Sequence, residues 1–167
     1  MSSGLISTLR DRGSSYPTLA AAESCTGGLL MARIVGTPLS GEWFKGGVVA
    51  YQPAVKFELL GVDPGPVITS RAAEQMATGV CRLLSAEVGV STTGVAGPES
   101  EEGVAVGTVF VGFAGPEGVE CFELRLQGDP SEIMTQAVDF AIARIGSMIP
   151  SAPPKDEGPA KRALLEC

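Results

Sequence analysis

Glycine and proline interrupt this chain so often that the elements of secondary structure between them are short. The 167 residues include 22 glycines and 12 prolines. Between these interruptions, compact apolar runs typical of buried strands alternate with segments whose apolar residues recur at helical spacing. This alternation predicts an α/β fold, a three-layer α/β/α single domain with a mixed, mostly parallel sheet.

The expected elements follow from these runs. Strands are expected at residues 18–22, 44–51 and 90–95, followed by a hairpin of 104–113 and 119–126. Helices are expected at residues 5–9, 29–36, 53–60 and 70–88, the last with Ser70 as its N-cap, and from Asp129 onward, where Pro130 and Glu132 complete a helix-start pattern. The domain is expected to span residues 1–149, and residues 150–167, rich in proline, alanine and charge, are predicted to form a tail.

Charge and hydropathy exclude several classes of function. The formal net charge of −7 disfavours a phosphate-tracking surface, so we expect no nucleic-acid partner. No stretch approaches the roughly 18–20 apolar residues that span a bilayer, and the N-terminus lacks the pattern of a secretory signal. We therefore expect no membrane partner. The four cysteines form no C-x-x-C pair, which indicates reduced thiols and hence a cytoplasmic protein.

The absence of histidine restricts the catalytic chemistry. A chain without histidine cannot hold a Ser-His-Asp triad, a Cys-His pair or a histidine-based zinc site. Catalysis would depend on serine, threonine, cysteine, lysine, tyrosine or carboxylates, and we expect neither a metal nor a cofactor.

Ser24 is the candidate nucleophile. It lies at a predicted strand-to-helix turn, where backbone N–H groups of the helix start point outward. The following Thr26, Gly27 and Gly28 could hold an oxyanion or a substrate phosphate there. The alternative is that Ser24 only caps the helix and the glycines allow a tight turn.

Lys56 is the candidate base, because a serine hydroxyl needs one and the chain has no imidazole. Lys56 follows Tyr51 by five residues, just past a predicted strand end, and sites in parallel sheets gather at such ends. Burial would favour the neutral amine, and the Tyr51 phenol could relay a proton or donate a hydrogen bond. The alternatives are a solvated lysine and an ordinary tyrosine at a strand end.

Another predicted strand end carries a loop of small residues, T-T-G-V-A-G-P at residues 92–98. Small side chains would let a ligand approach the backbone, so Thr93 and Gly94 are candidate substrate-binding residues. The alternative is a plain turn into the next strand.

Four motifs together resemble the CinA C-terminal domain family. They are A-E-S-C-T-G-G at residues 22–28, the segment 51–56 with L-L-G-V at 59–62, T-G-V-A-G-P at 93–98 and V-G-T-V at 106–109. The family includes stand-alone nicotinamide mononucleotide deamidases. The resemblance implies the three-layer fold, homo-oligomerisation, and hydrolysis of the carboxamide of nicotinamide mononucleotide to nicotinate mononucleotide and ammonia. It also implies that Ser24 is the nucleophile, Lys56 its base, and Tyr51 and Thr93 further site residues.

The sequence departs from this family pattern at three places. Gln52 stands where asparagine or serine is usual, and residues 38–41 replace a glycine-serine turn. Where the family has G-D-R and a further arginine downstream, residues 128–130 read G-D-P, and Ile133 and Met134 lie nearby. The substrate phosphate is therefore expected at the glycine-rich helix start, with Arg33 or a residue of a partner subunit. Two alternatives are a non-catalytic nucleotide-sensing or protein-binding module related to competence and DNA-damage responses, and an amidase for another small amide.

Overall fold

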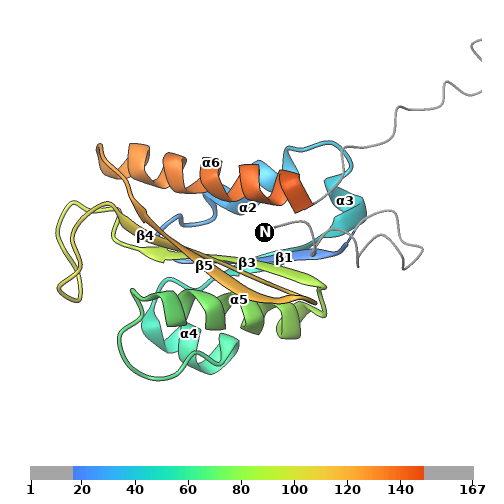
Figure 1. Ribbon diagram of the computed structural model, residues 1–167, viewed down its shortest axis with the longest axis horizontal. Helices are drawn as coiled ribbons and strands as arrows, with labels where there is room; N and C mark the ends of the chain where they lie inside the picture. Colours follow the sequence, from blue (N-terminus) through green and yellow to red (C-terminus); the bar gives the residue numbers. More distant parts are fainter. Residues whose placement is uncertain (1–16, 149–167) are drawn as a thin grey trace, which may run out of the picture.

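The computed structural model describes residues 17–148, which form one five-stranded sheet with helices on both faces (Figure 1). The strands are β1 (Leu19–Glu23), β2 (Phe44–Val49), β3 (Val88–Gly94), β4 (Thr108–Gly115) and β5 (Gly118–Arg125). The helices are α2 (Leu29–Val35), α3 (Ser40–Trp43), α4 (Pro53–Leu60), α5 (Ser70–Leu84) and α6 (Pro130–Met148). The helix expected at residues 5–9 and the tail expected at residues 150–167 lie outside the described residues.

The sheet is mixed, as predicted. Its strand order is β2-β1-β3-β4-β5, with β1 parallel to β2 and β3, and with β4 antiparallel to β3 and β5. Only β4 therefore runs against the other strands of the described sheet. The carboxyl ends of β1, β2 and β3 lie at one edge, where α/β proteins place their ligands.

Strand β1 is buried on both faces and lies between the two helix layers. Leu19 and Ala21 pack with α2 and α6, whereas Ala20 and Ala22 pack with α4 and α5 on the opposite face (Figure 1). Successive strand residues point to opposite faces, so a run of small apolar residues lets helices approach the strand closely from both sides. The result is the three-layer α/β/α arrangement.

The helix predicted at residues 70–88 ends earlier than predicted. Helix α5 ends at Leu84, because Ser85 takes a left-handed conformation with a φ of 51° and its N–H donates to Cys81 O. Val88 opens β3 instead of closing the helix. A short apolar run after a turn is compatible with either element, so spacing alone did not separate them.

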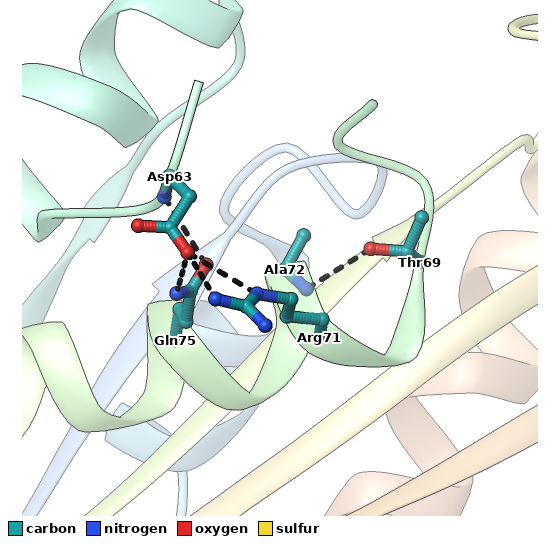
Figure 2. Close-up of polar contacts among 5 residues, drawn as sticks. All are labelled: Asp63, Thr69, Arg71, Ala72 and Gln75. Atoms are coloured by element: carbon teal, nitrogen blue, oxygen red, sulfur yellow. Dashed lines mark hydrogen bonds and ion pairs between the residues drawn. The ribbon is translucent and has the colours of Figure 1, made fainter. Parts of the chain in front are cut away.

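The N-cap of α5 is also displaced by one residue. Thr69, not Ser70, takes the extended cap conformation, and its Oγ1 accepts from Ala72 N at 3.0 Å (Figure 2). Helix α3 has no counterpart among the expected elements.

Helix α6 begins as predicted. Asp129 Oδ1 accepts from Glu132 N, and Glu132 Oε2 accepts from Asp129 N, both at 2.9 Å. This reciprocal pair satisfies two N–H groups that lack partners within the helix. Neither α6 nor any other helix within residues 17–148 is long and apolar enough to cross a bilayer.

Candidate active site

A pocket of about 150 Å³ opens where the carboxyl ends of β1, β2 and β3 meet. Ser24 enters it directly after β1, Tyr51 just after β2, and Thr93 and Gly94 at the end of β3, while Lys56 enters it from α4. The residues that line it outside the predicted set are Cys25, Pro53, Val67, Ile68, Val95, Ala96, Gly97, Glu99 and Glu101.

Ser24 is held through its backbone and leaves its hydroxyl without a partner. Its N–H donates to Thr92 O at 2.9 Å, which continues the pairing of β1 with β3 one residue further. Ser24 is 7% exposed, and no hydrogen bond engages its Oγ within residues 17–148. Ser24 does not cap α2 either, because the cap residue is Gly28, with a φ of 103°. The hydroxyl is therefore available to a ligand in the pocket.

The start of α2 is occupied by the carboxylate of Glu23. This side chain is fully buried, and its Oε2 accepts from Gly28 N at 2.9 Å and Leu30 N at 3.1 Å, while Oε1 accepts from Met31 N at 2.7 Å. A carboxylate on these N–H groups takes the place that an external anion would occupy. The start of α2 therefore offers no phosphate site in this arrangement.

Thr26, Gly27 and Gly28 do not line the pocket, although their positions in the sequence predict contact with the substrate. The Gly28 N–H donates to Glu23, the Gly27 N–H donates to Ser24 O at 3.1 Å, and Thr26 Oγ1 donates to Glu23 Oε2 at 2.6 Å. These groups shape the turn that presents Ser24.

The side chain of Lys56 is almost completely buried. It is 1% exposed, and its Nζ donates to Tyr51 O at 3.0 Å. Burial lowers the pKa of Lys56 from its ordinary 10.5, because the ammonium loses its hydration, and the nearby Cys25, Glu101 and Glu102 offset part of this effect. Burial therefore makes the neutral amine that a base requires easier to form than on an exposed lysine.

Lys56 and Ser24 line the same pocket. No hydrogen bond joins Lys56 Nζ to Ser24 Oγ in the part of the chain that the structure describes. Tyr51 contacts the lysine through its backbone carbonyl, and its side chain extends to the rim, where the residue is 70% exposed. Catalytic hydrogen bonds often tighten only when substrate is bound, so this geometry is compatible with proton transfer.

Cys25, beside the candidate nucleophile, is an inert thiol. Burial raises its pKa to about 12, so the thiolate that would act as a nucleophile is scarce at neutral pH. The arrangement favours Ser24 over Cys25 as the attacking group.

One wall of the pocket is formed by Val67 and Ile68, and two other segments hold it in place. Thr93 Oγ1 donates to Val67 O at 2.8 Å. The carboxylate of Glu102 accepts from Val67 N and Ile68 N, both at 2.9 Å. Thr93 is thus a wall-supporting residue as well as a lining residue.

The same segment is attached to α5 by Asp63. Asp63 Oδ2 accepts from Arg71 Nε at 3.1 Å and from Gln75 Nε2 at 2.8 Å (Figure 2). The hydrogen bond from Arg71, followed by that from Gln75, lowers the pKa of Asp63. These contacts connect the pocket wall to the long helix beneath the sheet.

Two carboxylates at the pocket, Glu99 and Glu101, are not among the residues predicted from the sequence. The available signal was their position directly after the small-residue loop at a strand end. Arg33, expected near the phosphate, instead pairs with Asp139 of α6 at 2.9 Å and does not line the pocket. Within residues 17–148, no group of three or more histidine, cysteine or acidic side chains is placed to hold a metal ion.

Comparison with known sequences identifies one family. The sequence model of the CinA C-terminal domain matches residues 2–149. A CinA-like protein from Frankia casuarinae is 44% identical over 141 residues, which are 81% of this chain and 33% of that protein. A putative competence-damage inducible protein from Halothermothrix orenii is 42% identical over 137 residues, 76% of this chain and 33% of that protein. The chain thus matches about a third of the length of these curated relatives.

Solved structures of the same superfamily share the fold. A competence-damaged protein (CinA) superfamily protein from Enterobacter cloacae superposes with a TM-score of 0.77 at 28% identity, covering 87% of this chain and 88% of that one. A superfamily member from Klebsiella pneumoniae gives a TM-score of 0.76 at 30% identity, covering 87% and 92%.

Proposed function

This chain belongs to the CinA C-terminal domain family, and from that premise we propose that it is an amidohydrolase acting on nicotinamide mononucleotide. The products would be nicotinate mononucleotide and ammonia. The observation that carries the proposal is a buried lysine with a lowered pKa in the same pocket as a serine hydroxyl that has no partner within residues 17–148. A module that only bound nucleotides would have no need to bury an amine there.

In the first half of the reaction, Ser24 Oγ attacks the carboxamide carbon and neutral Lys56 accepts its proton. The bond between that carbon and the amide nitrogen then breaks, and Lys56 returns the proton to the leaving ammonia. Tyr51 O, as the acceptor of the Lys56 hydrogen bond, orients the amine. The exposed Tyr51 ring lies where it can cover the substrate at the rim.

The developing oxyanion needs N–H donors next to Ser24. Within residues 17–148, the N–H of Cys25 contacts only its own thiol, whereas the N–H groups of Gly27 and Gly28 are engaged by other residues. Because Cys25 lines the pocket and Thr26 does not, we assign the oxyanion to the N–H of Cys25, and one such donor is typically worth roughly 3–4 kcal/mol.

In the second half, a water molecule attacks the acyl ester on Ser24. Lys56 accepts a proton from that water and returns it to Ser24 Oγ as the ester bond breaks. The nicotinate product leaves and the free enzyme is restored. The second proton of that water leaves with the new carboxyl group, which ionises to nicotinate in solution, while the other transferred protons pass through Lys56.

The test is release of ammonia from nicotinamide mononucleotide by the purified protein and its variants. We expect Ser24→Ala and Lys56→Met each to reduce kcat by at least about a thousandfold, since nucleophile and base act as a unit. Lys45→Met is the matched control, because Lys45 is another lysine bonded to a backbone carbonyl, Ser85 O, and does not line the pocket. Near-normal rates for Lys56→Met at pH 7, with an unchanged circular dichroism spectrum, would show that Lys56 is not the base.

We further propose, from the family membership, that copies of this chain assemble into a homo-oligomer in the cytoplasm. Light scattering of the purified protein measures the oligomeric state directly. A mass equal to one chain at micromolar concentration contradicts it.

A further inference from the structure

The pocket carries unbalanced negative charge. Glu99 and Glu101 line it, and their carboxylates make no hydrogen bond or salt bridge within residues 17–148. Among the described residues that line the pocket, Lys56 is the only cation. Because the lysine must be neutral to act as a base, the reactive form of the pocket holds two carboxylates and no positive charge.

Two arginines of the described helices, Arg33 and Arg71, do not compensate for these carboxylates. Arg33 is paired with Asp139 and Arg71 with Asp63, and neither arginine lines the pocket. Both carboxylates are exposed to solvent, which hydrates them, and a positively charged ligand would gain modest further stabilisation from them.

A second feature shows that the pocket is built for a ligand. The Ser24 hydroxyl, on a residue more than nine-tenths buried, lines the cavity without a partner within the described chain. A carboxamide that meets Ser24 would place the ring that carries it against the remaining pocket wall, which includes the loop of Glu99 and Glu101.

We propose that Glu99 and Glu101 make the pocket selective for amides carried on a positively charged ring. The inference rests on the proposed function, and it deepens it by naming the charge that the site recognises. The pyridinium ring of nicotinamide mononucleotide has this charge, whereas its 1,4-dihydro form has a neutral ring with the same carboxamide, ribose and phosphate. Attraction between two carboxylates and the ring cation would favour the oxidised ligand.

The experiment compares the dissociation constants of these two ligands. Calorimetry is carried out in the Ser24→Ala background so that no turnover occurs. We expect the oxidised form to bind about tenfold more tightly than the reduced form, as two partly exposed charge pairs would allow. When Glu99→Gln and Glu101→Gln are introduced into the same background, the ratio of the two dissociation constants should fall to about twofold or less. Only the oxidised form should bind more weakly.

Glu42→Gln is the matched control. Glu42 is an exposed residue of α3, which precedes β2 and so lies at the opposite end of that strand from the pocket. The control should leave the ratio unchanged. Unchanged binding of the reduced form to the doubly substituted variant shows that its pocket remains folded.

The outcomes separate this inference from the proposed function. If wild-type protein releases ammonia but the preference for the charged ring survives both substitutions, the inference is wrong and the function stands. If no ammonia is released but the preference depends on Glu99 and Glu101, the function is wrong and the inference stands. Equal affinity for both ligands, or binding of neither, overturns the inference.

Discussion

At the scale of single residues, burial decides which side chains can react. Lys56 is almost completely removed from water, which favours its neutral amine, and Cys25 is buried enough to remain a protonated thiol. The same physical effect therefore lowers the pKa of the Lys56 amine and raises the pKa of the Cys25 thiol. The proposed chemistry depends on this difference.

The pH dependence of kcat/KM should report the protonation state of Lys56. A base must be neutral, so the rate should rise with pH up to the lysine pKa, which burial places below 10.5. Glu101 raises that pKa by its negative charge, so Glu101→Gln should move the midpoint to lower pH. Rates measured between about pH 5 and 10 locate this midpoint. We expect it to shift by on the order of one pH unit in Glu101→Gln and to stay in place in the control Glu42→Gln. A midpoint that stays in place or moves upward contradicts the role of Lys56.

At the scale of elements, the turn between β1 and α2 is organised by Glu23. Its carboxylate accepts from three backbone N–H groups of the helix start and from the Thr26 hydroxyl. Thr26 Oγ1 in turn lies 2.7 Å from Thr92 Oγ1 at the end of β3. Glu23, the residue before Ser24, thus connects a short helix to the sheet and fixes the position of Ser24.

Glu23→Gln should destabilise the protein strongly. The amide supplies one oxygen and an NH₂ group, so donors that now face a carboxylate would face another donor in a buried site. We expect a loss of about 2–4 kcal/mol in the free energy of unfolding. Urea unfolding measures it, and the exposed Glu42→Gln should change it by less than about 0.5 kcal/mol. Equal stability of wild type and Glu23→Gln would mean that the turn does not depend on this carboxylate.

At the scale of the whole molecule, glycines set the distance between the sheet and α5. A Cβ added at Gly89 of β3 would lie 2.2 Å from Ala77 O, and one added at Gly112 of β4 would lie 2.6 Å from Ala73 O. The helix backbone therefore rests directly on the sheet. Displacing it would also disturb the pocket wall, which Asp63 attaches to α5 (Figure 2).

Gly89→Ala should lower both stability and activity. The new methyl group meets helix backbone, which cannot rotate away, so we expect a loss of about 1–3 kcal/mol. The matched control is Gly146→Ala in α6, where a Cβ meets nothing within 4 Å and alanine should stabilise by up to about 1 kcal/mol. Thermal unfolding of the two variants measures the difference. A Gly89→Ala protein as stable as wild type would show that α5 can move outward freely.

The local sequence was sufficient to predict much of this architecture. Alternating apolar runs predicted the strands and the mixed sheet, and residues 53–60 and the start of α6 were placed correctly, because turn and capping residues act over a few positions. The C-terminal end of α5 was predicted wrongly, because the apolar spacing after Leu84 fits a helix as well as a strand.

The candidate residues Ser24, Tyr51, Lys56, Thr93 and Gly94 could be named from the sequence, because strand ends are recognisable locally and meet at one edge of a parallel sheet. Which groups reach the cavity was decided only by the tertiary structure. The Glu23 carboxylate folds back onto the helix start, while Glu99 and Glu101, from a loop beyond β3, supply charge at the pocket. Such contacts depend on side-chain direction and burial, and these are properties of the packed chain that no linear pattern contains.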